Sequence, residues 1–332
     1  MIVRFAIPFF IIVAFVLLPL TLYGLSRWLL PRRYGQLAGI LLAAADIVLA
    51  AYGMTAGFRP LVVRHIEFAS TDLPAAFDGY RIVHFSDAHV GTLTGSRESL
   101  IPQLIDSING QTPDMIVFTG DMQNIRPEEL IPPMLHFRRL YAPDGVYAVL
   151  GNHDYATYQT GNEKEKVQNC QLTQDIIRKM GFDLLLNEHR TIRLPKKQRH
   201  DSLASDSDSI VLGGMENWGT AQRMPRRGDV RQTLAGLSGR QPFTIMLQHD
   251  PTCWRQKILP ECHAQLTLSG HTHGGQFSLL GWSPAALVYD EWQGLTMKKS
   301  RGLLVTTGAG SLIPFRLNQP REIVVITLKR KH

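Results

Sequence analysis

The residues best able to do chemistry in this sequence are histidines, aspartates and one asparagine that directly follow short apolar segments. In SGHTHGGQ, residues 269–276, His271 and His273 stand with one residue between them and glycines around them. Four similar groups occur elsewhere: Asp87 and His89 in SDAHVG, Asp121 in GDMQN, Asn152, His153 and Asp154 in GNHD, and His249 in LQHDP. Carboxylate, imidazole and amide oxygen, without a thiolate, suit Mn²⁺, Fe, Zn²⁺ or a similar ion.

The segments that precede these groups have the character of buried strands. They are short and apolar, and they cover residues 80–86, 114–120, 145–151, 242–248 and 264–270. Each polar group alone is commonplace, because a lone histidine is more often a hydrogen-bonded structural residue than a ligand. Ligands of α/β proteins, however, gather outside the carboxyl ends of the strands. Five groups at equivalent positions therefore predict one shared site.

Asp121 stands alone after its segment, as a carboxylate that bridges two ions would. Two ions ~3.5 to 4 Å apart can share a hydroxide and clamp a phosphoryl oxygen, which makes water a nucleophile near neutral pH. A metallopeptidase of the HExxH type is excluded, because the motif does not occur and the candidate ligands are spread over five strand ends.

The remaining pattern predicts an α/β fold. Helical spacing over residues 97–109, 127–140 and 163–180 places helices between the first strands. Further strand-like segments at 182–194, 209–215, 302–308 and 322–328 predict a second sheet that packs on the first. Residues 195–209 are polar and predict a loop or hairpin tip.

Two apolar runs near the N-terminus predict a membrane anchor. Residues 5–25 carry no charge and residues 37–58 carry only Asp46, so each run can cross a ~30 Å hydrocarbon layer as a helix. A cleaved signal peptide is the alternative for the first run, but the run is longer than a signal's apolar region and no small-x-small cleavage site follows. We expect a two-helix anchor over 1–58, a connector ending at an edge strand over 59–79, and a catalytic domain over 80–332. Asp46 would face the partner helix or a headgroup, or be incidental.

The arginines around these runs indicate on which side of the membrane the catalytic domain lies. Arg27, Arg32 and Arg33 lie between the runs, and the positive-inside rule keeps that loop cytoplasmic, so the catalytic domain would be non-cytoplasmic. The margin is small, because Arg4, Arg59 and Arg64 lie on the opposite side.

The net charge of +7 suits phosphates or a lipid surface as partners. No basic stripe with interleaved aromatic residues occurs, so no nucleic-acid partner is expected. The arginines of Arg223–Arg231 form either a solvated loop or a contact for anionic groups. Three cysteines, an odd and sparse set, argue against a disulfide framework. Further candidates follow the proposed ligands or a strand: Asn124, Tyr155 and residues 216–218. They either touch substrate or have a structural role.

The motifs in this order resemble the calcineurin-like metallophosphoesterases. That family's pattern is DxH, GD, GNHD or GNHE, a histidine, then GHTH or GHxH, and here it runs from Asp87 to His273. The resemblance covers about residues 80–330. The two glycines and Gln276 after GHTH, with the apolar hairpin, resemble the membrane-anchored bacterial branch. The resemblance implies an α/β/β/α sandwich of two packed mixed sheets.

The resemblance also implies a role for each matched residue and a cofactor of two divalent metal ions, with Mn, Fe, Zn or a similar metal left open. Asp87, His89 and His273 would bind the first ion, Asp121 would bridge, and Asn152, His249 and His271 would complete the second site. His153 would act on the leaving oxygen as general acid or hydrogen-bond donor, oriented by Asp154.

The implied function is a metal-dependent phosphoester hydrolase that uses a bridging hydroxide. With the hairpin, a phosphodiesterase or pyrophosphohydrolase acting on a lipid-linked substrate such as UDP-2,3-diacylglucosamine is expected. Family membership does not fix the substrate. A phosphomonoesterase on soluble substrates, with the hairpin only a tether, stays open, as does a catalytically silent membrane scaffold. The oligomeric state is open.

Overall fold

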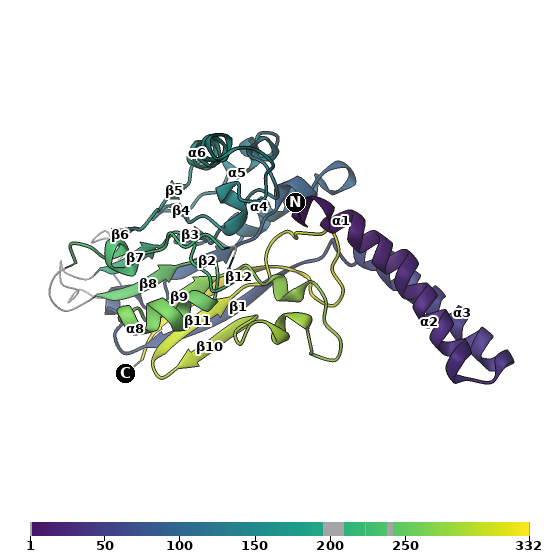
Figure 1. Cartoon of the computed structure of the whole chain (residues 1–332). Helices are drawn as coiled ribbons and strands as arrows, with labels where there is room; N and C mark the ends of the chain where they lie inside the picture. Colours follow the sequence, from purple (N-terminus) through teal and green to yellow (C-terminus); the bar gives the residue numbers. More distant parts are fainter. Residues whose placement is uncertain (1, 195–208, 223, 238–241, 332) are drawn as a thin grey trace.

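Two long apolar helices extend from a two-sheet domain (Figure 1). The computed structural model describes residues 2–194, 209–222, 224–237 and 242–331. The first long helix comprises α1 (Ile2–Ile12), η1 (Val13–Leu17) and α2 (Leu18–Leu29), and the second is α3 (Arg32–Met54). Residues 6–29 and 32–54 are long and apolar enough to cross a membrane.

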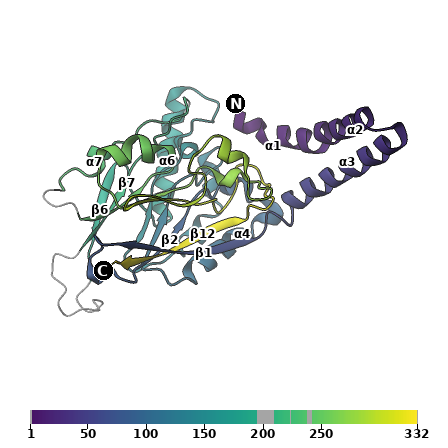
Figure 2. The ribbon, with the colours of Figure 1, turned by 90° about the horizontal axis from the view of Figure 1, so that it is seen from below.

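Glycines let the two helices of this hairpin approach closely. A Cβ on Gly35 would lie 2.6 Å from the carbonyl oxygen of Ser26, and one on Gly39 would lie 2.9 Å from the ring of Tyr23. Small residues at such contacts are the usual means by which helices pack in lipid. The apolar runs of the sequence therefore form one antiparallel helix pair (Figure 2).

The first sheet is mixed and has the strand order β1-β12-β2-β3-β4-β5. Strands β2 to β5 are parallel, β12 is antiparallel to β2, and β1 is parallel to β12. The strands are β1 (Leu61–Ser70), β2 (Arg81–Phe85), β3 (Met115–Phe118), β4 (Val146–Ala148), β5 (Asp183–Leu184) and β12 (Arg321–Arg330).

The second sheet is also mixed and has the order β10-β11-β9-β8-β7-β6. Its central strands are parallel, and β6 and β10 pair antiparallel at the two edges. The strands are β6 (Glu188–Ile192), β7 (Ile210–Gly214), β8 (Phe243–Leu247), β9 (Leu266–Ser269), β10 (Gly294–Lys298) and β11 (Arg301–Val305).

Helices cover the outer faces of the two sheets (Figure 1). They are α4 (Leu100–Asn109), α5 (Met134–Phe137), α6 (Glu163–Lys179), α7 (Val230–Thr233) and α8 (Leu259–Glu261). Single turns occur at η2 (Ala75–Phe77), η3 (Val90–Thr92), η4 (Gly95–Arg97), η5 (Pro127–Leu130), η6 (Asn152–Tyr155), η8 (Trp254–Ile258), η9 (His273–Gly275) and η10 (Pro284–Leu287).

Side chains along each strand point alternately to the two faces of the sheet, and this divides the core into layers. On β2, Ile82 faces the second sheet, whereas Val83 and Phe85 pack with α4 on the outer face. Successive strand side chains point to opposite faces, so a strand buried on both sides is apolar throughout. Together with a third cluster around Trp254 outside the second sheet, this gives the expected α/β/β/α sandwich.

Three expectations from the sequence differ from the structure. Residues 182–194 are not one strand: β5 belongs to the first sheet and β6 to the second, and Asn187 turns the chain between them with φ 57°. The helix expected over 127–140 is only η5 and α5, because Pro132 and Pro133 interrupt it. The connector over 59–79 contains β1, which pairs with β12 over ten residues, so its edge strand lies near its start.

The division into anchor, connector and catalytic domain stays a prediction. Most of the predicted polar loop, residues 195–208, lies outside the described residues.

His84 predicts a pH dependence of stability. It is fully buried on β2, its Nε2 lies 2.8 Å from Thr119 Oγ1, and burial lowers its pKa to about 3. An unfolded histidine has a pKa of about 6.5, so below that pH the unfolded chain binds a proton that the folded chain refuses. The free energy of unfolding should therefore fall as the pH drops from about 6.5 towards 3.

We expect His84→Gln to remove this contribution, which amounts to as much as about 1.4 kcal/mol per pH unit below the unfolded pKa. Chemical unfolding of the full chain in detergent micelles at several pH values measures the two slopes. Equal slopes for wild type and variant would show that His84 does not resist protonation.

Candidate metal centre

The sequence-predicted site residues converge where five strands end. Asp87 and His89 follow β2, Asp121 follows β3, Asn152 to Asp154 form η6 after β4, His249 follows β8, and His271 and His273 follow β9. All are buried except His271, which is partly buried. The carboxyl ends of parallel strands in both sheets thus open onto one place, as the sequence predicts.

The backbone of this site is unusual. Five of the predicted ligands have a positive φ angle: Asp87 (53°), His89 (39°), Asp121 (61°), His271 (71°) and His273 (53°). Residues with a side chain rarely adopt this left-handed conformation, and its cost of order 1 to 3 kcal/mol is tolerated mainly at functional sites. The strain therefore marks these turns as shaped for the placement of their side chains.

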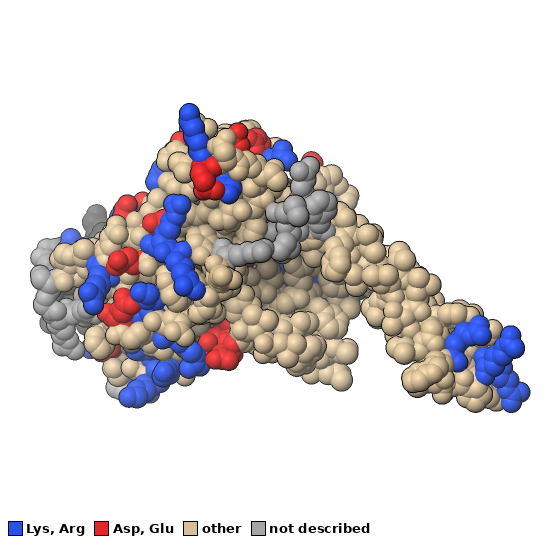
Figure 3. Space-filling model, in the orientation of Figure 1, with Lys and Arg blue, Asp and Glu red and all other residues tan. Residues whose placement is uncertain are grey.

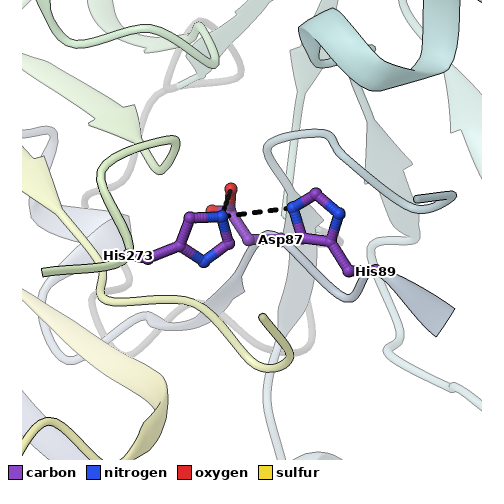
Figure 4. A group of neighbouring side chains, drawn as sticks. All are labelled: Asp87, His89 and His273. Atoms are coloured by element: carbon purple, nitrogen blue, oxygen red, sulfur yellow. Dashed lines mark hydrogen bonds and ion pairs between the residues drawn. The ribbon is translucent and has the colours of Figure 1, made fainter. Parts of the chain in front are cut away.

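Asp87, His89 and His273 form a first cluster, and their side chains point toward one another (Figure 4). The Nε2 atoms of the two histidines lie 3.2 Å apart, and His273 Nε2 lies 3.6 Å from Asp87 Oδ1. Burial lowers the pKa of His89 to about 3 and holds the pKa of His273 well below its usual value. Both imidazoles are thus neutral near pH 7, the form in which histidine binds a metal.

A second cluster surrounds Nε2 of His249. Asn152 Oδ1 and Asp121 Oδ2 each lie 3.2 Å from this atom, and His271 Nδ1 lies 3.1 Å from it. His249 Nδ1 lies 2.8 Å from the carbonyl oxygen of Thr119, which can only accept, so Nδ1 carries a proton. Asn152 Nδ2 donates to Tyr158 Oη at 2.8 Å, so the oxygen of Asn152 faces His249.

Four atoms of this cluster therefore face one another mainly with lone pairs: Nε2 of His249, Oδ1 of Asn152, Oδ2 of Asp121 and Nδ1 of His271. A proton on Nε2 of His249 could form a hydrogen bond to only one of the other three at a time. Burial opposes charge on His249, but the carboxylates of Asp121 and Asp87 raise its pKa above its usual value. A cation among the four atoms would satisfy all of them, and this donor set suits Mn²⁺, Fe or Zn²⁺.

Asp121 lies between the two clusters. Its Oδ2 is 3.6 Å from His89 Nε2 and 3.2 Å from His249 Nε2, whereas its Oδ1 accepts the backbone N–H of His153 at 2.8 Å. Burial would raise the pKa of Asp121, but His249, His153 and His89 hold it well below its usual value. A carboxylate that stays ionised between two sets of ligands has the position that a bridging group needs.

Glycines make room for two of these carboxylates. A Cβ on Gly270 would lie 2.2 Å from Asp87 Oδ2, and a Cβ on Gly151 would lie 2.2 Å from Asp121 Oδ1. The glycines that precede His271 and Asn152 in the sequence motifs are therefore needed for close approach.

His153 stands at the edge of both clusters. Its Nδ1 donates to the carbonyl oxygen of Asn124 at 2.5 Å, and its Nε2 lies 4.0 Å from Asp121 Oδ2. Its ring packs edge-on against His89 and over Tyr158. His89, Asp121 and His153 are also close enough to share an ion.

The orienting role expected for Asp154 stays a prediction, and the Nδ1 atom of His153 itself contacts the carbonyl oxygen of Asn124. Asp154 is fully buried, and its carboxylate accepts the backbone N–H groups of Asp121, Met122, Gln123 and Gly151 at 2.8 to 3.2 Å. It therefore shapes the turns that carry Asp121 and Asn152. Burial nevertheless raises its pKa to about 7.

Sequence reasoning missed Arg316. This guanidinium is fully buried and donates to the carbonyl oxygens of Thr307, Gly308, Gly310, Gln319 and Pro320. The loop it holds touches the first cluster, since Gly310 donates its N–H to the carbonyl oxygen of Asp87 at 2.8 Å. No motif surrounds Arg316, so nothing in the sequence distinguishes it from a surface arginine. Tyr158, four residues after Asp154, could have been suspected from its position.

The second group of candidates is mainly structural. Tyr155 is buried and its hydroxyl accepts the backbone N–H of Asn217 at 3.0 Å, so it links two loops. The guanidinium of Arg227 lies over the ring of Tyr155, and that of Arg226 over Trp218. Tyr155, Arg226 and Arg227 line a polar pocket of about 420 Å³ with Lys166. Arg223 lies outside the described residues.

The position of Asp121 predicts how metal content responds to substitution. We expect Asp121→Ala to lose both ions, because its carboxylate borders both clusters, and Asp87→Ala to lose mainly one. His84→Gln, a change of a buried polar residue outside the clusters, is the control. Metal analysis of the purified full chain after loading with Mn²⁺ measures the ions per chain. Equal losses from Asp121→Ala and Asp87→Ala would contradict the bridging position.

Comparison with known proteins agrees with this geometry. The family model described as calcineurin-like phosphoesterase matches residues 80–275. The metallophosphoesterase YkuE of Bacillus subtilis is 30% identical over 303 residues, which cover 88% of this chain and 94% of that protein. A Danio rerio protein named "Transmembrane protein with metallophosphoesterase domain" is 29% identical, over 85% of this chain and 61% of that protein.

A further relative carries a substrate in its name. The UDP-2,3-diacylglucosamine pyrophosphatase LpxG of Chlamydia trachomatis is 28% identical over 295 residues, which cover 77% of this chain and 86% of that protein. The match over residues 80–275 spans all five strand ends that supply the two clusters. From the order of its motifs, their convergence in the structure and the extent of these matches, the chain belongs to the calcineurin-like phosphoesterase family of metal-dependent phosphoester hydrolases.

Proposed function

We propose that this chain hydrolyses the phosphoester or pyrophosphate bond of a membrane lipid, of the class of UDP-2,3-diacylglucosamine, with two metal ions. The observation that carries the proposal is the pair of ligand clusters joined by Asp121. The lipid class is supported by the likeness to LpxG and by the two helices that can cross a membrane.

The buried donors fit a pair of ions. Nε2 of His249 has three lone-pair donors within 3.2 Å, and Nε2 of His89 faces Nε2 of His273. Asp87, His89 and His273 would hold one ion, Asn152, His249 and His271 the other, with Asp121 shared. When bound, two such ions supply an activated water and neutralise charge on the phosphoryl oxygens.

His153 is our candidate for the proton donor to the leaving oxygen. Its Nδ1 is held by the carbonyl oxygen of Asn124, so the ring is fixed and Nε2 is its free end toward the site. As water oxygen bonds to phosphorus and the bond from phosphorus to the leaving oxygen breaks, Nε2–H would transfer its proton to that oxygen.

Sidedness is proposed from the arginines. Arg27, Arg32 and Arg33 lie at the tip of the hairpin, at the end remote from the two-sheet domain (Figure 3). The positive-inside rule places such a tip in the cytoplasm and the catalytic domain on the other side.

A fusion experiment tests this orientation. Alkaline phosphatase fused to the C-terminus should be active in a bacterial host, because this enzyme becomes active only outside the cytoplasm. Green fluorescent protein fused at the same place should be dark, because it does not become fluorescent when it is exported unfolded. Replacing all three tip arginines by glutamine should weaken the preference. The reverse pattern for the unsubstituted chain would place the domain in the cytoplasm.

Turnover by the full chain in detergent micelles tests the function. With Mn²⁺, we expect cleavage of UDP-2,3-diacylglucosamine and of the soluble diester bis(4-nitrophenyl) phosphate, and little cleavage of phosphomonoesters. A preference for soluble monoesters would favour the tethered phosphomonoesterase. No cleavage of any of them by metal-loaded chain would indicate a silent scaffold.

His153→Ala should keep its metal ions but lose about 10² to 10⁴-fold in rate, because it removes a general acid and no required ligand. His136→Ala, which removes a histidine outside the two clusters, is the control. Metal content and turnover are measured on the same preparations. Loss of metal from His153→Ala, to the degree seen with Asp87→Ala, would make His153 a ligand.

A further inference from the structure

A large apolar cavity lies between the membrane hairpin and the two-sheet domain. Its volume is about 660 Å³. Both helices of the hairpin line it, and so do two loops of the domain: the turn at 272–277 and the loop at 312–317. The lining includes Phe10, Ala14, Leu49 and Ala50 from the hairpin and Phe277 and Phe315 from the domain.

The cavity is joined to the metal centre. His273 belongs both to the first ligand cluster and to the cavity lining. The next turn continues this connection, because Gln276 donates its side-chain amide to the carbonyl oxygens of Ile313 at 2.9 Å and Phe315 at 2.8 Å. The two loops that form the domain side of the cavity are thus one hydrogen-bonded unit that starts at a candidate metal ligand.

The hairpin is packed on this unit. The ring of Phe315 lies 4.8 Å from that of Phe10, centroid to centroid, and a Cβ on Gly53 would lie 2.3 Å from the Phe315 ring. The backbone N–H of Arg316 donates to the carbonyl oxygen of Gly53 at 2.9 Å. Arg316 also holds the loop next to Asp87 by its side chain. The anchor therefore contacts the elements that build the metal centre.

Among the described residues, two polar side chains that line the cavity have a buried atom without a hydrogen-bond partner, Asp46 (Oδ2) and His273 (Nδ1). A buried carboxyl oxygen without a partner is unfavourable, so a ligand that donates a hydrogen bond there would be favoured over a plain hydrocarbon. Acyl chains that carry a hydroxyl group or are joined by an amide have such a donor.

We propose that this cavity binds an acyl chain of the lipid substrate, so that the hairpin forms part of the substrate site. The inference rests on the proposed function. A ligand with a phosphate at one end and a hydrocarbon at the other matches a cluster of metal ligands that shares His273 with the lining of an apolar cavity. The helices that line the cavity can themselves cross a bilayer, so a lipid can enter it from the membrane.

A matched pair of substitutions on one helix tests the proposal. Ala50 lines the cavity and is 6% exposed, whereas Ala44 lies on the exposed side of α3. Ala50→Phe fills space that the chain would occupy, and Ala44→Phe adds the same group outside. Each CH₂ group that loses its buried position costs about fourfold in affinity, so displacing two or more should raise the KM for UDP-2,3-diacylglucosamine about tenfold or more.

The soluble diester separates the cavity from the metal centre. For Ala50→Phe we expect kcat/KM for bis(4-nitrophenyl) phosphate to change less than about twofold, since that substrate has no acyl chain. Ala44→Phe should match wild type on both substrates. An unchanged lipid KM in Ala50→Phe, or an equal effect of Ala44→Phe, would overturn the proposal while diester cleavage still supports the phosphoesterase function.

Photo-crosslinking provides a test that does not depend on turnover or on the variant folding. The probe is a diacyl phosphonate lipid with a diazirine at the end of one acyl chain, added to wild-type full chain in micelles. We expect labelled peptides from residues 10–18 or 312–317. Labels confined to exposed faces of α2 and α3 would overturn the proposal. If neither substrate is cleaved, the proposed function fails, and the labelling pattern still decides whether the cavity holds an acyl chain.

Discussion

The close approach of buried lone-pair donors at the metal centre, which calls for positive charge between them, is the constraint on which the rest of the structure depends. Carboxylate, amide and imidazole atoms from five strand ends face one another in a buried space, with contacts of 3.1 to 3.6 Å around His249, His89 and His273. Lone-pair donors that face one another in a buried space are costly, so a cation between them would stabilise the arrangement. The surrounding fold can then be understood as what holds these donors together until ions bind.

Several features of the fold supply that rigidity. The turns after β2, β3 and β9 hold residues with side chains at positive φ angles. Asp154 ties two of the turns together through backbone N–H groups, and Arg316 fixes the loop behind Asp87. Both side chains are buried and bond mainly to backbone groups, with one further hydrogen bond from Arg316 to the hydroxyl group of Ser311. These hydrogen bonds, which are charge-assisted for Arg316, help to offset the backbone strain near the ligands.

The hairpin packs on a loop that is hydrogen-bonded to the turn carrying the candidate ligand His273. Gln276, three residues after His273, hydrogen bonds to the loop against which Phe10 and Gly53 pack. A simple tether would need none of these contacts. The glycines and glutamine that follow the two histidines thus link the ligand-bearing turn to the loop on which the apolar helices pack. This contact is a physical reason for the anchor to lie beside the metal centre.

The sequence by itself determined the family, the strand ends and the candidate ligands, because motif order and apolar segments are local features of the chain. It also predicted the helix pair, since length and hydropathy decide whether a helix can cross lipid. It could not find Arg316, or the contact of His153 with Asn124, because these depend on loops far apart in sequence. Only the tertiary structure decided that β5 and β6 lie in different sheets, that proline breaks the helix near 132, and that a cavity joins Asp46 to His273. Packing between distant segments has no local signature, so it is decided only when the chain is folded.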